Sequence, residues 1–237
     1  MRPPRTGWGL SLPRSGRRWT MGDEWRVAAA VRQPKSAAIA GLAFGLILTG
    51  VLVLLHSAAP GSVAQSGDWI TDVERRDAVS KALALIPFAG IAFLWFVAVV
   101  RSSLGRHDDR FFDAIFMGSG LVFVSMLFAA AAVLMAALAL SDAGALRDQE
   151  FPLEAWVLSS ALLGSFGARI AAVFALAVST ASLRVGSLPR WLVLVGYLTG
   201  VLLLLTPPLP PWAQLLFPLW VMAISIQVLV REHAAKG

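Results

Sequence analysis

Long apolar stretches separated by short polar loops make up most of this 237-residue chain. Each stretch has about 20 residues or more, the length at which an α-helix crosses the hydrocarbon of a bilayer. None shows strand-like alternation, and a helix satisfies its own backbone hydrogen bonds in lipid. The pattern predicts an all-α, polytopic integral membrane protein with six transmembrane helices in one bundle. The predicted spans are Ala37–Ala58, Ala82–Val100, Ala114–Leu140, Ala155–Ser179, Leu188–Thr206 and Trp212–Val230.

The composition agrees with a membrane protein. Hydrophobic residues make up 57% of the chain and charged residues only 14%, whereas a soluble domain carries about 25% charged residues. The chain has no cysteine, which excludes a disulfide framework, a thiolate metal site and a cysteine nucleophile.

The basic residues collect in alternate loops, which is the pattern that sets the orientation of a membrane protein. After Met21, most of them fall in the N-terminal segment, the loops 101–113 and 180–190, and the C-terminal tail; the other loops hold fewer. The first group is Arg26, Arg32, Lys35, Arg101, Arg106, Arg110, Arg184, Arg190, Arg231 and Lys236, and the second is Arg75, Arg76, Lys81 and Arg147. We therefore expect a multi-pass protein of the plasma or bacterial inner membrane, with both termini in the cytoplasm.

The formal net charge of +6 does not indicate nucleic-acid binding. The basic residues lie at the ends of apolar segments and form no continuous stripe with interleaved aromatic residues. The partners that we expect are the lipid bilayer and either a second copy of the chain or another membrane protein.

Residues 1–36 differ from the rest of the chain. They are rich in arginine and proline and lack hydrophobic periodicity, so we predict a disordered, basic cytoplasmic segment. Met21, followed by Gly-Asp-Glu, is an alternative start of translation. The predicted organisation is this segment, a six-helix transmembrane domain over residues 37–231, and a short cytoplasmic tail over 232–237.

Several helix ends and contacts can be predicted from local chemistry. Thr71 and Glu74 fit a capping box, with Thr71 as the N-cap of the second helix. Tryptophans near predicted boundaries are typical of the membrane interface, and pairs of small residues four apart allow close helix packing in lipid. The tryptophans are Trp69, Trp156, Trp191 and Trp212, and the pairs are Gly41 and Gly45, Ser160 and Gly164, and Gly196 and Gly200.

Arg169 is the one charged residue well inside a predicted span. A charge there costs roughly 2.5–3.5 kcal/mol on insertion scales, so it requires a partner or a function. Helical periodicity places Ser165 on the face of Arg169 and Gly164 on the opposite, small-residue face. We therefore expect the fourth span to be contacted on both sides, and we predict an intramembrane polar site of Arg169, Ser165 and Asp113. Asp113 is the predicted acceptor, with Gln227, Tyr197 and backbone carbonyls near Pro218 as alternatives.

The search for catalytic motifs yields no candidate residues. No histidine lies in the interior of a span, since His56 is at an outer end, and the sequence has no zinc-protease, phosphate-loop or dinucleotide motif. We predict no enzymatic activity, cofactor or metal. The expected function is that of an accessory or structural membrane protein that assembles with itself or another protein. The alternative is a small permease or channel for an anionic or amphipathic solute, with Arg169 at the membrane midplane.

Overall fold

The computed structural model describes residues 34–59, 68–103, 110–146, 150–205 and 211–234. The described residues form helices joined by short turns, and no β-strand occurs among them. The predicted all-α class is therefore confirmed. The predictions for residues 1–33, including disorder and a start at Met21, lie outside the described residues, as do residues 235–237 of the predicted tail.

Seven α-helices and three short helices of other types follow one another along the described chain. The α-helices are α2 (Pro34–Ser57), α3 (Val73–Ser103), α4 (Arg110–Asp142), α5 (Glu150–Ser160), α6 (Ala168–Val185), α7 (Arg190–Leu205) and α8 (Leu216–Ala234). The short helices are the 3₁₀-helices η2 (Asp68–Ile70) and η4 (Pro211–Leu215) and the π-helix η3 (Ala161–Gly167).

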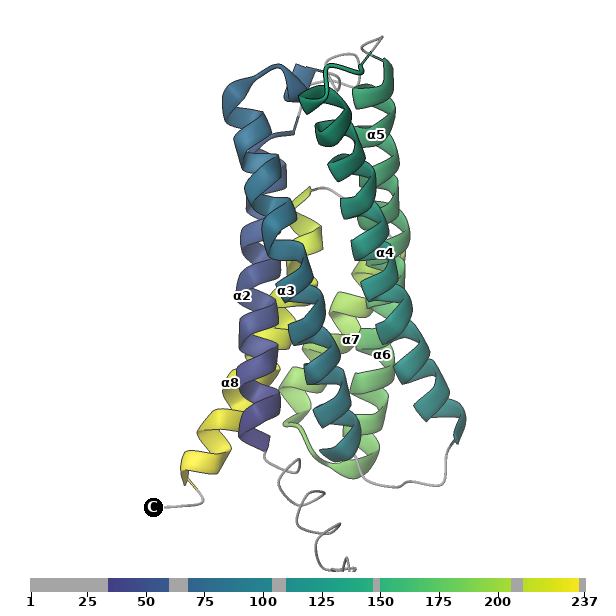
Figure 1. Ribbon diagram of the computed structural model, residues 1–237. Helices are drawn as coiled ribbons and strands as arrows, with labels where there is room; N and C mark the ends of the chain where they lie inside the picture. Colours follow the sequence, from purple (N-terminus) through teal and green to yellow (C-terminus); the bar gives the residue numbers. More distant parts are fainter. Residues whose placement is uncertain (1–33, 60–67, 104–109, 147–149, 206–210, 235–237) are drawn as a thin grey trace, which may run out of the picture. The chain divides into compact units, whose positions relative to one another are not determined.

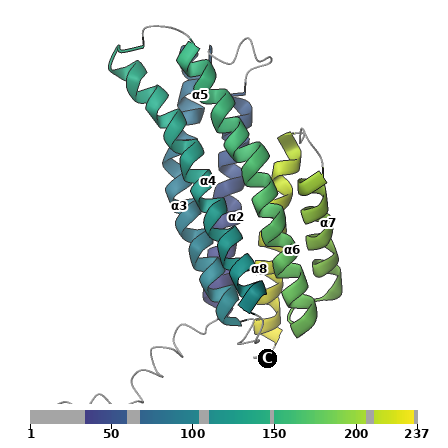
Figure 2. The same cartoon turned by 90° about the vertical axis from the view of Figure 1, so that its right-hand side faces the viewer.

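Five helical stretches are long and apolar enough to cross a membrane, and they indicate a membrane-embedded protein. The prediction of six spans is confirmed only for these five. The sixth apolar helix, α7, has 16 residues and is about 24 Å long, shorter than a hydrocarbon core of about 30 Å. In Figure 2, α7 stops well short of the height that α4 and α5 reach. The five stretches are Ser36–Ser57, Val73–Arg101, Asp113–Asp142, Glu150–Val185 and Trp212–Arg231.

Glycines bring two helix pairs into close contact. Helix α2 packs between α3 and α8 (Figure 1), and a β-carbon on Gly45 would lie 2.9 Å from the carbonyl oxygen of Pro218 in α8. Helix α7 packs on α6, where a β-carbon on Gly200 would lie 3.1 Å from the carbonyl oxygen of Ala172. Close approach at the glycine pairs of α2 and α7 is therefore confirmed. Helix α6 also contacts α4, so this part of the span has neighbours on two sides, whereas Ser165, on the face of Arg169, is exposed.

A cluster of phenylalanines joins five helices in the interior. Phe93 of α3 is the central member, because its ring centroid lies within 6 Å of those of the other four. All five are almost completely buried. Edge-to-face and tilted ring pairs of this kind stabilise more than their buried area alone. The other members are Phe44 of α2, Phe123 of α4, Phe174 of α6 and Phe217 of α8.

The helix ends form two groups, which we name the arginine end and the tryptophan end. At the arginine end, Arg101 of α3 donates two hydrogen bonds to Asp113 of α4, of 2.8 and 2.6 Å, and Arg231 donates to the carbonyl oxygen of Ser187. At the tryptophan end, the indole of Trp69 donates to the carbonyl oxygen of Pro152 at 3.1 Å. Trp69 is completely buried, so it packs inside the protein and does not face lipid, and its predicted depth near the membrane interface stays a prediction.

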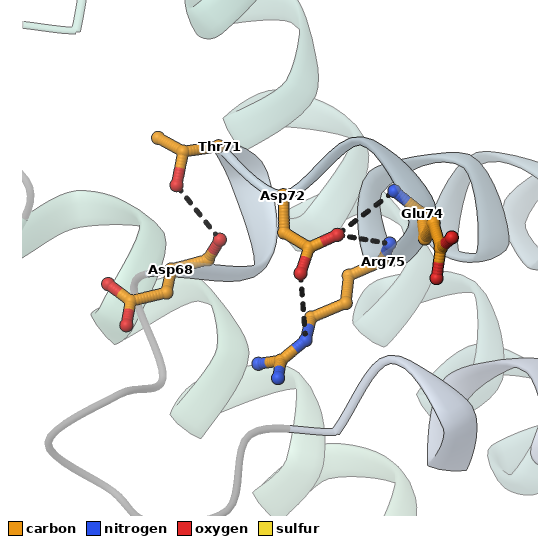
Figure 3. Close-up of polar contacts among 5 residues, drawn as sticks. All are labelled: Asp68, Thr71, Asp72, Glu74 and Arg75. Atoms are coloured by element: carbon orange, nitrogen blue, oxygen red, sulfur yellow. Dashed lines mark hydrogen bonds and ion pairs between the residues drawn. The ribbon is translucent and has the colours of Figure 1, made fainter.

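The N-terminus of α3 is capped one residue later than predicted. Asp72 Oδ1 accepts hydrogen bonds from the backbone N–H groups of Glu74 and Arg75, at 3.0 and 3.2 Å (Figure 3). The hydroxyl of Thr71 instead donates to the carbonyl oxygen of Asp68. The predicted capping box of Thr71 and Glu74 is therefore wrong: Thr71 closes the preceding 3₁₀ turn, and the carboxylate of Asp72 has the better position on the free amides.

Candidate functional site

A π-helical segment interrupts the longest helical stretch of the structure. Residues 150–185 continue without a break from α5 through η3 into α6. The segment Ala161–Gly167 has seven residues, whereas a π-helix is usually a single widened turn, often at a functional site. The longest span therefore departs from α-helical geometry near its middle, at the residues just before Arg169.

The segment presents Gly164 to the interior of the bundle. A β-carbon on Gly164 would lie 2.9 Å from the side-chain amide nitrogen of Gln214 in η4. Next to it, Gly167 is buried against Met126 of α4. The small-residue face predicted for this span is thus packed. The side-chain amide of Gln214 can lie this close to the helix because Gly164 has no side chain.

A pocket of about 230 Å³ lies beside Gly164, between α2, α4, α5, η3 and η4. Four leucines line it, and its polar side chains come from three separate elements. Its lining residues are Leu52, Leu55, His56, Ala59, Leu134, Trp156, Ser159, Ser160, Leu163, Gly164 and Gln214.

The polar side chains of the pocket differ in whether they already have a hydrogen-bond partner. The Nδ1 atom of His56 lies 2.6 Å from the carbonyl oxygen of Leu52. Because a carbonyl can only accept, Nδ1 carries the proton and Nε2 of the neutral ring is an acceptor. The hydroxyl of Ser159 is already bonded to the carbonyl oxygen of Ala130 in α4. His56, Ser160 and Gln214, together with the indole N–H of Trp156, can form hydrogen bonds with a molecule in the pocket.

Arg169 lies on another face of the same stretch. Its guanidinium donates a hydrogen bond of 2.7 Å to the carbonyl oxygen of Ser165, one turn back on its own helix. The side chain is partly buried, and both Ser165 and Phe166 are exposed. Arg169 does not line the pocket beside Gly164.

The structure brings Arg169 and Ser165 together but not Asp113. Asp113 is paired with Arg101 at the arginine end, so the predicted pair of Arg169 and Asp113 is not formed. Ser182 marks the level of the arginine end on the helix of Arg169, because it lines a cavity there. The two residues are 13 positions apart, which is about 20 Å along the helix. An arginine side chain, directed toward its helix N-terminus as here, does not extend back over that distance.

Sequence reasoning did not identify His56 or Gln214 as site residues. His56 is at the last turn of α2, and Gln214 follows a run of prolines. Neither position carries a motif, because the two residues meet only through the packing of α2, η3 and η4. The π-helical geometry that exposes Gly164 to Gln214 likewise has no signature in this sequence.

Comparisons of this chain with protein-family models, with curated proteins and with solved structures found no match. Within the described ranges, no three acidic or histidine side chains lie close enough together to hold a metal ion.

Proposed function

We propose that this protein is a non-enzymatic membrane protein that binds a small amphipathic molecule in the pocket beside Gly164. The observation that carries this proposal is the π-helix in the longest span, facing a pocket with polar groups from three elements. Such a pocket combines an apolar wall with a few convergent hydrogen-bonding groups, as small-molecule sites in proteins do.

The chemistry of the pocket favours a neutral, hydrogen-bonding head with a short apolar body. Leu52, Leu134 and Leu163 offer an apolar surface, while His56 and Gln214 offer hydrogen-bonding groups. The volume of about 230 Å³ is below the usual range of about 300–1,000 Å³ for drug-sized ligands, so the ligand is small.

The distribution of charge supports an orientation with the arginine end in the cytoplasm. Basic residues dominate there among the described loops, whereas the tryptophan end carries most of the acidic ones. Both termini are then cytoplasmic, in a plasma or inner membrane, and the pocket lies in the outer leaflet. A ligand would enter from that leaflet. The acidic residues are Asp68, Asp72, Glu74, Asp77, Asp142, Glu150 and Glu154.

The absence of cysteine from the chain makes a direct test simple. Cysteine is introduced at Ser160 in the pocket or, as a control, at the exposed Ser125 of α4. The rate of reaction with a small thiol reagent is measured with and without 1-octanol, a neutral amphipathic probe. We expect octanol to slow the reaction at least threefold at Ser160→Cys and not at Ser125→Cys.

The pocket residues sharpen the test. Gln214→Leu and His56→Phe should each weaken the protection by octanol, and Gly164→Leu should fill the pocket and block the reaction at Ser160→Cys. Equal slowing at positions 160 and 125, or protection that persists in all three variants, would contradict the proposal.

A second candidate is the accessory or assembly function predicted from the sequence. It is favoured by an open apolar groove of about 440 Å³ on the outer surface of α2 and α3. Three alanines line it, together with Phe88 and Trp95, which are both about 60% exposed. A groove with small residues suits a transmembrane helix. If it holds a second copy, Ile91→Cys should give a disulfide-linked dimer under oxidation; if only monomer forms, self-assembly through this groove is excluded.

A further inference from the structure

The charge of Arg169 has no acidic partner in the described part of the chain. The four ion pairs found there join other residues, and the bond from Arg169 goes to a backbone carbonyl. A guanidinium has five N–H donors and binds carboxylate or phosphate in a bidentate manner. A single hydrogen bond to a carbonyl oxygen does not neutralise the charge, and it leaves most of these N–H donors available to a ligand.

The register of α6 against α7 shows that α7 does not cover Arg169. The two helices are antiparallel: Thr180 is hydrogen-bonded to Tyr197 at 2.9 Å, and Leu176 contacts Gly200. Thr180, Leu176 and Arg169 share one helical face. Continuing this register by seven residues places Arg169 opposite a position beyond Leu205, the last residue of α7. Helix α7 therefore ends before it reaches the guanidinium.

The side chain of Arg169 is directed toward the tryptophan end, because it bonds back to Ser165. On the same side, Phe166 is 60% exposed, and the exposed hydroxyl of Ser165 is a second hydrogen-bond donor. The partly buried arginine and this exposed serine thus lie together beyond the last residue of the short helix α7.

We propose that Arg169 and Ser165 bind the phosphate of a phospholipid from the leaflet at the tryptophan end. A helix shorter than the hydrocarbon core thins the bilayer beside it, and an arginine at membrane depth is stabilised by thinning and by its own snorkelling. Both effects act at the end of α7 and bring the headgroups toward the guanidinium. The ligand is a phosphodiester, and the site is separate from the pocket beside Gly164.

A spin label near the site tests this proposal in phospholipid bilayers. The label is attached to Phe166→Cys, and its coupling to ³¹P nuclei is measured in phosphate-free buffer. The matched control is a label at Ser125→Cys. Ser125 is exposed and adjoins Met126, which packs on Gly167, so the two labels lie at the same level of the bundle. We expect ³¹P coupling at position 166 that is at least several times that at position 125.

Variants of Arg169 complete the experiment. Arg169→Gln should reduce the coupling at position 166 to that at position 125, whereas Arg169→Lys, which keeps the charge, should retain part of it; circular dichroism verifies that both variants fold. In detergent without phospholipid, inorganic phosphate should give no coupling, and coupling there would show a site for free phosphate instead. Equal coupling at both positions, or coupling unchanged by Arg169→Gln, would overturn the proposal.

Discussion

The two halves of this bundle differ in how closely their helix backbones approach one another. In the half toward the arginine end, Gly45 and Gly200 let helix backbones touch, and stability comes from close packing of many atoms. At the tryptophan end, side-chain hydrogen bonds and an ion pair join the helices, such as Trp69 to Pro152 and Arg76 to Ser141 and Asp142, as Arg101 and Asp113 do at the very end of the other half. The π-helix and the pocket lie between these two regions.

This difference follows from the number of helices present at each level. Helix α7 contributes only to the half toward the arginine end, and η4 begins beside Gly164 in the middle of the longest span. Beyond that level fewer helices remain, and a gap is left between α2, α4 and α5. The candidate site is therefore located where the packing arrangement changes.

The largest expected effect is at the glycine contacts. Gly45→Leu should destabilise the protein by about 3 kcal/mol, because its β-carbon would collide with a backbone carbonyl that cannot move aside. Unfolding in mixed micelles, followed by circular dichroism, measures the change. A β-carbon on Gly50 in the same helix would meet no atom within 4 Å, so Gly50→Leu should cost much less than Gly45→Leu. Similar losses in both variants would mean that α2 does not pack on α8 in this register.

At the tryptophan end, loss of one buried hydrogen bond should have the next largest effect. Trp69→Phe removes the hydrogen bond to the carbonyl of Pro152 and leaves a space where the completely buried indole packs, and it should cost about 2 kcal/mol in the same unfolding measurement. Trp191→Phe serves as the control, because Trp191 is 56% exposed and its replacement should cost less than about 0.5 kcal/mol. A negligible cost at Trp69 would show that polar contacts do not hold this end.

The cap of α3 distinguishes the observed structure from the sequence prediction. Asp72→Ala removes the acceptor of two backbone N–H groups and should lower the free energy of unfolding by about 1 kcal/mol. Thr71→Ala should have a smaller effect, since its hydroxyl bonds to the preceding turn. A larger loss for Thr71→Ala than for Asp72→Ala would instead support the predicted capping box of Thr71 and Glu74.

The smallest expected effect concerns a polar contact within the densely packed half. Thr180→Val removes the hydrogen bond to Tyr197, and interhelical hydrogen bonds in membranes contribute on average about 0.6 kcal/mol. A double-mutant cycle with Tyr197→Phe isolates this contribution. A coupling energy above about 2 kcal/mol would contradict the conclusion that packing, not hydrogen bonding, stabilises this half.

Local features of the fold were the most predictable from the sequence. Apolar length predicted helices, and the glycine pairs of α2 and α7 predicted close contacts that the structure contains. The failures are of two kinds. Thr71 and Asp72 are neighbours with similar capping chemistry, so the sequence could not decide between them. Asp113 was paired with the wrong arginine because Arg101 is brought to it only by the connection of α3 to α4.

The sequence by itself determined an all-helical membrane protein and marked Arg169 as an isolated charge, because helix length, apolar composition and charge position are local properties. Only the tertiary structure decided that α7 ends beside Arg169, that Phe93 contacts four other rings, and that His56 and Gln214 share a pocket with Gly164. These features depend on the register between helices. In lipid, that register is set by side-chain packing across the whole bundle and not by the hydrophobicity of any one segment.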